Sequence, residues 1–210
     1  MSLILASTSP RRKELLALLQ IPFDVMAPTY VEQLRSGCTA EEQVREFARG
    51  KAQSCSTQVP DALVLGSDTL IALDGNLLGK PVDLQEARAM LQRMSGREHL
   101  IYTAVAVRRE SDGLEEAHVE AVRVWMKPFE RVELDAYLRT GESSGKAGAY
   151  SIQGKGGQLI AKIQGDYTAA VGLPLRIVAT LLRRHGVSIP TDMERLYQQK
   201  HYPNWTHFNP

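Results

Sequence analysis

The chain has 210 residues, of which 43% are hydrophobic and 23% are charged. Its 25 Lys and Arg residues against 24 Asp and Glu residues leave a formal net charge of +1, which gives no electrostatic reason to expect a nucleic-acid or membrane-surface binder. A chain of this length buries roughly 70% of its unfolded surface, so one globular domain is expected. There is no apolar run of ~20 residues, no signal-peptide pattern and no C-x-x-C pair, so we expect a soluble, cytoplasmic protein with reduced thiols.

The predicted elements alternate between strands and helices from the N-terminus. The first half contains strands or extended stretches at residues 3–6, 22–28, 62–65 and 70–73, and helices at 10–19, 40–54 and 84–94. The second half contains an antiparallel strand pair at 99–108 and 119–127, a strand at 158–163, and helices at 132–139 and 174–184. Beyond Val187 the periodicity is lost, which predicts an extended C-terminal arm.

A polar segment at residues 7–12 stands between the first strand and the first helix. Ser9 suits the N-cap and Pro10 the first helical position, which places Arg11 and Arg12 where the helix dipole disfavours cations by about 0.3 to 1 kcal/mol. An anion docked on the free amides and the guanidinium groups would reverse that penalty, so the segment is a candidate polyphosphate site. The alternative is two solvated arginines that fold back onto nearby carboxylates.

Asp68 lies in the segment 66–69, between two apolar runs. A carboxylate near the end of a buried strand has to be paired, hydrogen-bonded or bound to a metal, because leaving it bare costs several kcal/mol. Lys51 and Lys80 are candidate partners. The alternative is a structural Asp in a turn, and Glu32, a second carboxylate, is on its own only a polar loop residue.

The stretch 146–157 is rich in glycine but fits no standard nucleotide loop. Its spacing misses the Walker A pattern and contains no G-x-G-x-x-G. The remaining functional interpretation is that the backbone of this stretch approaches a ligand closely, and that the side-chain amide of Gln153 offers it both a donor and an acceptor. The alternative is a glycine-rich surface hairpin. The histidines form no zinc spacing, no G-x-S-x-G elbow is present, and His99 is expected to be a packed residue.

In this order along the chain, several segments resemble the Maf family of nucleoside triphosphate pyrophosphatases, and the resemblance spans about residues 3 to 186. The segments are Leu5–Leu16, Gly66–Thr69, Leu78–Pro81, Ser95-Gly96 with His99 and Thr103, Lys146–Tyr150, Ile152–Gly154 and Gly172–Leu175. The resemblance implies an α/β fold like that of inosine triphosphate pyrophosphatases: a mixed twisted sheet with flanking helices and two lobes around a cleft.

The resemblance also implies a reaction, the hydrolysis of a nucleoside triphosphate between its α and β phosphates with a divalent cation, Mg²⁺ or Mn²⁺. Asp68 would be the catalytic base, and Glu32 with Asp68 would hold the metal. The phosphates would be bound by the set Ser7, Arg11, Arg12, Lys51 and Lys80. Glu32 and Asp68 suit this metal chemically, because Mg²⁺ binds through one or two carboxylates together with substrate phosphates.

Within the family, the subgroup that acts on dTTP and UTP has an Arg, a Thr and a Gln at three positions, here Arg12, Thr69 and Gln153. An amide at Gln153 can pair with the O4 and N3–H edge of uracil or thymine. The function predicted from the resemblance is therefore a house-cleaning dTTP/UTP pyrophosphatase that also removes non-standard or modified pyrimidine nucleotides.

The alternative is a nucleotide-binding regulator of cell division that does not turn the nucleotide over. The pyrophosphatase domain is predicted over residues 1–187, with a C-terminal extension at 188–210. The expected partner is the nucleotide, with neither nucleic acid nor membrane, and family habit suggests a homodimer.

Overall fold

A computed structural model describes residues 2–208. Its strands are β1 (Leu3–Ala6), β2 (Asp24–Met26), β3 (Leu63–Leu73), β4 (Asn76–Leu78), β5 (Glu98–Arg109), β6 (Leu114–Met126) and β7 (Ile160–Gln164). Its α-helices are α1 (Pro10–Ala17), α2 (Ala40–Ser56), α3 (Leu84–Met94), α4 (Arg131–Leu138), α5 (Tyr167–Val171), α6 (Leu175–Arg184) and α7 (Met193–Gln199). Short 3₁₀ helices are η1 (Ala147–Ala149), η2 (Lys155–Leu159) and η3 (Pro203–His207).

The strands form one mixed sheet in the order β2-β1-β3-β5-β6-β7, with β4 also beside β3. β1 runs parallel to both β2 and β3, whereas β3–β4 and β6–β7 are antiparallel. In the parallel register Leu5 lies opposite Val25 on one side and Leu65 on the other. The mixed sheet with flanking helices confirms the predicted fold class.

The chain divides into two compact units. The first unit comprises the residues up to Thr69 together with 103–120 and 172–199, and the second unit comprises 70–102, 121–171 and the residues from Lys200 onward. Strands β3, β5 and β6 each contribute residues to both units.

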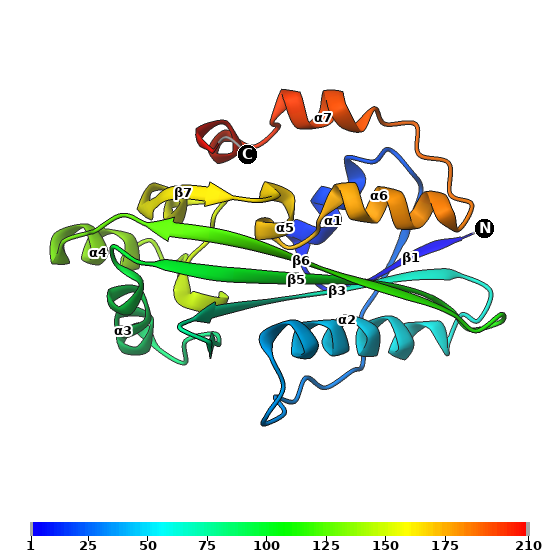
Figure 1. Ribbon diagram of the computed structural model, residues 1–210, viewed down its shortest axis with the longest axis horizontal. Helices are drawn as coiled ribbons and strands as arrows, with labels where there is room; N and C mark the ends of the chain where they lie inside the picture. The colour runs from blue at the N-terminus through cyan, green and yellow to red at the C-terminus, as the bar shows by residue number, and fades with distance from the viewer. Residues whose placement is uncertain (1, 209–210) are drawn as a thin grey trace. The chain divides into compact units, whose positions relative to one another are not determined.

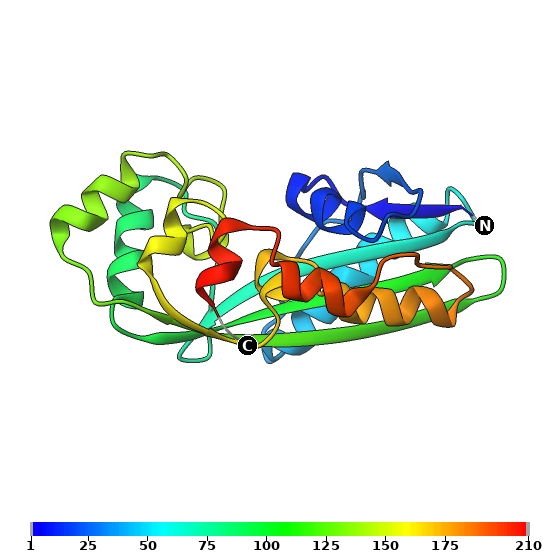
Figure 2. The same ribbon diagram turned by 90° about the horizontal axis from the view of Figure 1, so that it is seen from above.

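In the first unit, α2 covers one face of the strands and α6 covers the opposite face (Figures 1 and 2). α2 begins at a capping box, in which the Thr39 side chain accepts from the backbone N–H of Glu42 and the Glu42 carboxylate accepts from the backbone N–H of Thr39. The helix buries Val44, Phe47 and Cys55 at helical spacing. Each large side chain buried in this way stabilises the fold by roughly 1.5 to 3 kcal/mol.

The contact between α2 and β3 depends on Gly66. A Cβ atom at this position would lie 2.3 Å from the backbone oxygen of Ala48 and 2.7 Å from the backbone nitrogen of Ala52. Only a residue without a side chain lets the helix approach the strand this closely. Because Lys51 lies between these two alanines, Gly66 also sets the position of the Lys51 side chain.

In the second unit, α3 is capped by Asp83, whose carboxylate accepts from the backbone N–H of Glu86. Met90 and Met94 of this helix are buried in the core. The buried ring of His99 lies 2.7 Å from the Tyr150 hydroxyl through its Nε2 atom. Burial lowers the pKa of His99 to about 4, so the imidazole is neutral at pH 7, and the expectation of a packed histidine is confirmed.

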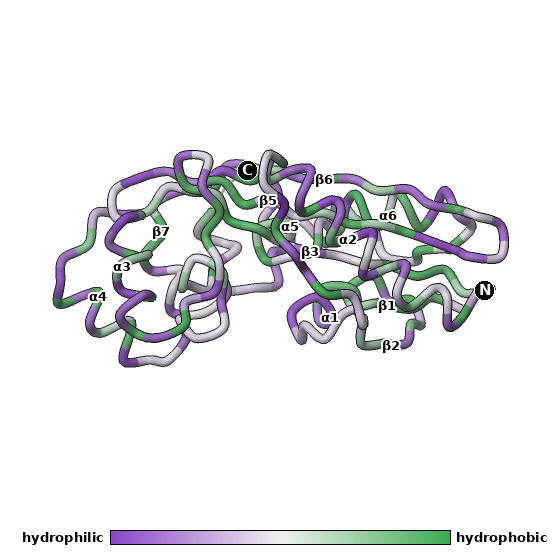
Figure 3. Tube along the Cα trace, turned by 90° about the horizontal axis from the view of Figure 1, so that it is seen from below, coloured by the Kyte–Doolittle hydropathy of each residue, from purple (hydrophilic) through white to green (hydrophobic). Residues whose placement is uncertain are grey.

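The turn between β5 and β6 is hydrophilic (Figure 3). Arg109 and Asp112 form an ion pair across it, and Gly113 has a φ of 69°, a conformation that favours glycine. Within residues 2–208, no helix combines the length and the apolar character needed to cross a bilayer.

Two sequence predictions about the fold are wrong, and two alternatives are excluded. The stretches 62–65 and 70–73 belong to a single strand, β3, which also excludes the alternative of Asp68 in a turn. The glycine-rich stretch forms η1 and η2, which excludes the alternative of a surface hairpin. Residues after Val187 form α7 and η3 instead of an extended arm.

We predict that Gly66→Ala destabilises the protein by about 1 to 3 kcal/mol or more, because the added methyl group meets backbone atoms that cannot rotate away. Denaturant unfolding followed by circular dichroism measures this. Gly79→Ala is the matched control, since nothing lies within 4 Å of its Cβ position. Equal unfolding midpoints for the two variants would contradict the assigned contact.

Candidate active site

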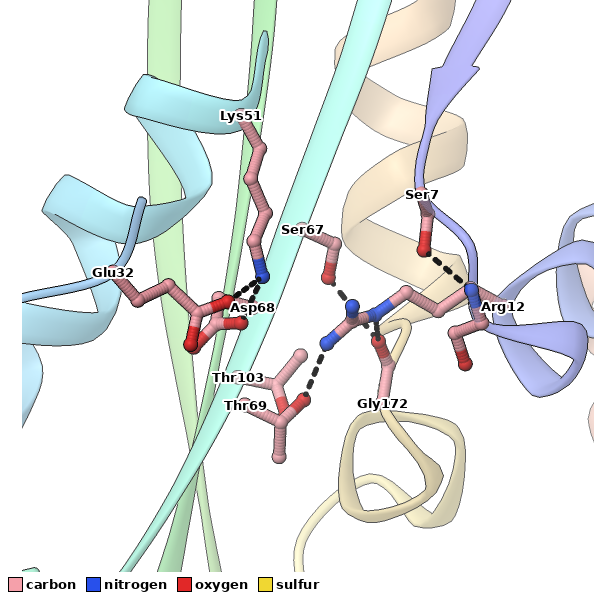
Figure 4. A network of polar contacts seen from close by, with 10 residues as sticks. Ser7, Arg12, Glu32, Lys51, Ser67, Asp68, Thr69, Thr103 and Gly172 are labelled. Carbon is pink, nitrogen blue, oxygen red and sulfur yellow. Dashed lines mark hydrogen bonds and ion pairs between the residues drawn. The ribbon is translucent and has the colours of Figure 1, made fainter. Parts of the chain in front are cut away.

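Lys51 on α2 contacts two carboxylates, those of Glu32 and Asp68 (Figure 4). Its Nζ atom lies 2.6 Å from Glu32 and also donates a hydrogen bond to Oδ1 of Asp68. The side chains of Lys51 and Asp68 are 10% and 8% exposed, whereas that of Glu32 is 45% exposed. One ammonium group therefore holds a buried carboxylate and a more exposed carboxylate at the same place.

Glu32 reaches Lys51 because its loop packs over α2. A Cβ atom at Gly50 would lie 2.3 Å from the ring of Tyr30, so glycine allows this ring to rest on the helix. The ring centroid of Tyr30 is 6.2 Å from that of Phe47, which anchors the loop two residues before Glu32. The glycines at 50 and 66 thus bring two separate segments to the same lysine.

Asp68 is a buried acid with one oxygen available. Its Oδ2 atom is buried and has no hydrogen-bond partner among the described residues. Burial raises the pKa of this carboxyl group, while the nearby charges of Lys51 and Arg12 oppose that rise. A carboxyl group with a raised pKa is a stronger base in its ionised form, and nearby cations favour that form, so the group suits the role of a general base.

The guanidinium group of Arg12 is held in place by hydrogen bonds to Gly172 and Thr69. Its Nε atom donates to the carbonyl oxygen of Gly172 at 2.9 Å, and its Nη2 atom donates to the hydroxyl oxygen of Thr69 at 3.1 Å. The hydroxyl groups of Thr69 and Thr103 are 3.0 Å apart, and the Ser67 hydroxyl also donates to the Gly172 carbonyl. The alternative of a solvated arginine is therefore wrong for Arg12.

The pKa values of both arginines are lowered by burial. For Arg12, attraction to Asp68 opposes the effect, and for Arg11, attraction to Glu14 opposes it. Guanidinium groups stay protonated in proteins, so the two side chains keep their positive charges. Because the two guanidinium groups are partly buried, they attract an anion more strongly than they would in bulk water.

The loop before α1 leaves the start of the helix without a side-chain cap. Ser9 occupies the N-cap position, but its side chain makes no capping hydrogen bond, and no acidic residue lies in the first turn. Ser7 is buried, and its hydroxyl oxygen accepts from the backbone N–H of Ser9 at 3.1 Å. Backbone N–H groups of this kind, beside two arginines, suit an anion such as a phosphate.

The remaining predicted residues, Lys80 and Gln153, belong to the second unit. Lys80 is exposed, and Gln153 is half-buried. Among residues 2–208, the side-chain amide of Gln153 has no hydrogen-bond partner, so both its donor and its acceptor are available for a ligand.

The carboxylates suit a metal that is held mainly by substrate. In the described part of the chain, no group of three or more His, Cys, Asp or Glu side chains could hold a metal ion on its own. Glu32 and Asp68 share Lys51, and Oδ2 of Asp68 lacks a partner among those residues. Two carboxylates with phosphate oxygens completing the coordination are the usual arrangement for Mg²⁺, so the residues fit such an ion.

Sequence reasoning gave no role to Ser67, Thr103 or Gly172. The structure shows that the Gly172 carbonyl accepts from Arg12 and from Ser67, and that the Thr103 hydroxyl is hydrogen-bonded to that of Thr69. Gly172 has a φ of 126°, which favours glycine, and a Cβ atom there would lie 3.4 Å from the Thr69 hydroxyl oxygen. The available signal was their place in the quoted motifs, but spacing alone does not show which side chain a distant carbonyl group contacts.

Solved structures with the same fold include the Ham1 protein of Staphylococcus aureus and a HAM1 protein from Coxiella burnetii. Both give a TM-score of 0.52, at 13% and 14% identity, and the matches cover 88% of this chain and 97% and 99% of theirs. At this identity the likeness concerns the fold alone.

Curated relatives share far more sequence. A dTTP/UTP pyrophosphatase of Methylobacillus flagellatus is 47% identical over 188 residues, which is 89% of this chain and 94% of the relative. One from Symbiobacterium thermophilum is 46% identical over 189 residues, covering 90% and 96%. One from Bacillus velezensis is 43% identical over 185 residues, covering 88% and 97%.

The Maf-like protein family matches residues 2–185, a range that includes every residue of the site described above. The family match and these relatives, which are 43% to 47% identical, agree with one another. The chain belongs to the family of Maf-like proteins.

Proposed function

We propose that this chain hydrolyses dTTP and UTP to the nucleoside monophosphate and pyrophosphate. The observation that carries the proposal is the buried carboxylate of Asp68, which is held by Lys51 and has one oxygen without a partner among the described residues. Relatives that are 41% to 47% identical over most of the chain are named dTTP/UTP pyrophosphatases. The chain is accordingly a hydrolase acting on an acid anhydride.

In the proposed reaction, Oδ2 of Asp68 accepts a proton from a water molecule whose oxygen attacks the α phosphorus. The bond between the α phosphorus and the bridging oxygen to the β phosphorus breaks, and pyrophosphate leaves. The raised pKa of Asp68 makes the carboxylate a stronger base, and Lys51 keeps it ionised before the transfer. Lys51 therefore favours the starting protonation state.

The positive charges act on the polyphosphate. Arg11, Arg12 and the first-turn N–H groups of α1 bind phosphate oxygens and offset the charge that develops on the leaving pyrophosphate. Ser7, Lys51 and Lys80 are the remaining proposed phosphate ligands. A divalent cation held by Glu32, Asp68 and phosphate oxygens would supply further neutralisation of the phosphate charge.

Arg12, Thr69 and Gln153 are proposed to select the pyrimidine base. The hydrogen bond between Arg12 and Thr69 positions two of these three side chains. The side-chain amide of Gln153 suits the O4 and N3–H edge of uracil or thymine. Removal of modified pyrimidine nucleotides is the role proposed in the cell. The domain boundary at residues 187/188, the homodimer and the cytoplasmic location stay predictions.

A regulator that only binds nucleotide is the competing function. Binding a polyanion does not need a buried carboxylate beside the cations, because that group repels phosphates unless a metal intervenes. The buried Asp68 therefore favours turnover over binding alone.

We expect pyrophosphate release from UTP and dTTP, with Mg²⁺ or Mn²⁺ present, at kcat/KM values at least about tenfold above those for CTP, ATP and ITP. A coupled pyrophosphate assay over this nucleotide panel measures the release. Nucleotide binding without release from UTP or dTTP would contradict the enzyme and support the regulator.

Asp68→Asn is expected to lower kcat by about 10² to 10⁴-fold, because an amide cannot accept the proton from water. Asp61→Asn is the matched control, since Asp61 is an exposed carboxylate in the turn before β3. Steady-state kinetics with UTP compare the two variants. If Asp68→Asn kept most of the turnover, Asp68 would not be the base.

A further inference from the structure

Asn204 contacts the loop that carries Gln153. Its Nδ2 atom donates to the carbonyl oxygen of Ile152 at 2.7 Å and to that of Gly154 at 2.9 Å. These carbonyl groups belong to the residues on either side of Gln153. The side-chain amide of Asn204, in η3, therefore bridges the backbone on both sides of Gln153, the residue proposed to recognise the base.

Glycine at position 157 makes room for this contact. A Cβ atom there would lie 2.3 Å from Nδ2 of Asn204 and 2.8 Å from the backbone oxygen of Ile152. Any side chain at this position would push the amide away from the loop. The glycine-rich composition of the loop is thus explained in part by the approach of residue 204.

The loop is also held through Glu142. The carboxylate oxygens of Glu142 accept from the backbone N–H groups of Lys155 at 3.0 Å and Gly156 at 3.3 Å. A Cβ atom at Gly154 would lie 2.4 Å from one of these oxygens. Backbone donors of the loop are therefore bound by a carboxylate, and backbone acceptors are bound by an amide.

Aromatic packing anchors the segment that carries Asn204. The rings of Tyr167 and Trp205 are stacked, with centroids 5.2 Å apart and planes inclined by 11°. Tyr202 and Phe208 stack on the same tyrosine with centroid distances of 6.5 Å. Tyr167 and Trp205 are both buried, so the hydrophobic gain of these rings offsets the entropy of ordering the segment.

We propose that Asn204 is a positioning residue for base recognition and that the segment 200–208 orders the Gln153 loop before the nucleotide arrives. This inference rests on the proposed function. Fixing the backbone on both sides of Gln153 lowers the entropy lost when its amide pairs with a pyrimidine, which strengthens binding. The family match ends at residue 185, so this contact comes from a segment outside the matched range.

The test is Asn204→Asp, which keeps the shape of the side chain but removes both N–H donors. Hydrogen exchange of the backbone amides of residues 152–157, followed by mass spectrometry without nucleotide, reports the order of the loop directly. Steady-state kinetics with UTP report base recognition. We expect faster exchange in the loop and a KM raised about five- to tenfold, as for the loss of one or two hydrogen bonds, with kcat within about twofold.

Gln198→Glu is the matched control, because it makes the same amide-to-carboxylate change at an exposed residue of α7. It should leave both exchange and KM unchanged. If Asn204→Asp does not fold, Asn204→Gln replaces it: this variant keeps both donors on a longer arm and should give a smaller rise in exchange and KM than Asn204→Ser.

The outcomes separate the two proposals. Unchanged loop exchange and unchanged KM in Asn204→Asp, with a wild type that hydrolyses UTP, would overturn the positioning role alone. A five- to tenfold fall in kcat with an unchanged KM would also overturn the positioning role. A wild type inert toward UTP would overturn the proposed function, while loop exchange would still test the contact of Asn204.

Discussion

Two carboxylates share one lysine, and the rest of the site depends on that contact. Burying Asp68 without a partner would cost several kcal/mol, and placing Glu32 beside it without a cation would add repulsion between like charges. Lys51 offsets both costs by contacting the two groups together. This contact requires α2 to lie close against β3 at Gly66 and the Glu32 loop to lie over α2 at Gly50, so two glycines without chemistry of their own determine the electrostatics of the site.

A second cation, Arg12, is fixed in a different way. Its inner hydrogen bonds go to a backbone carbonyl and a hydroxyl group, which do not neutralise its charge, so the positive charge remains available to a phosphate. Lys51 contacts carboxylates, whereas the Arg12 guanidinium contacts neutral oxygen atoms. The difference supports the separate roles proposed for the two cations: Lys51 would favour the ionised form of the base, and Arg12 would stabilise charge on the substrate.

Much of the site could be predicted from the sequence because several of its charged and polar residues lie in short segments, such as 7–12 and 66–69. Burial logic alone indicated that Asp68 needs a partner such as Lys51, and the structure confirms that contact. The prediction of two separate strands at 62–65 and 70–73 was wrong because Gly66 and Ser67 have turn-like composition, while pairing with β1 and β5 keeps this stretch extended. The C-terminal segment escaped prediction because its order depends on Trp205 stacking on Tyr167, a contact between residues far apart in sequence that periodicity cannot reveal.

In the proposed reaction, this site directs water to the α phosphorus of a pyrimidine nucleoside triphosphate. Hydrolysis of UTP in water enriched in oxygen-18, followed by mass spectrometry of both products, locates the attacked atom directly. Attack at the α phosphorus places one labelled oxygen in the monophosphate and none in the pyrophosphate, and this is the result we expect. Label in the pyrophosphate, or release of orthophosphate as the first product, would contradict it.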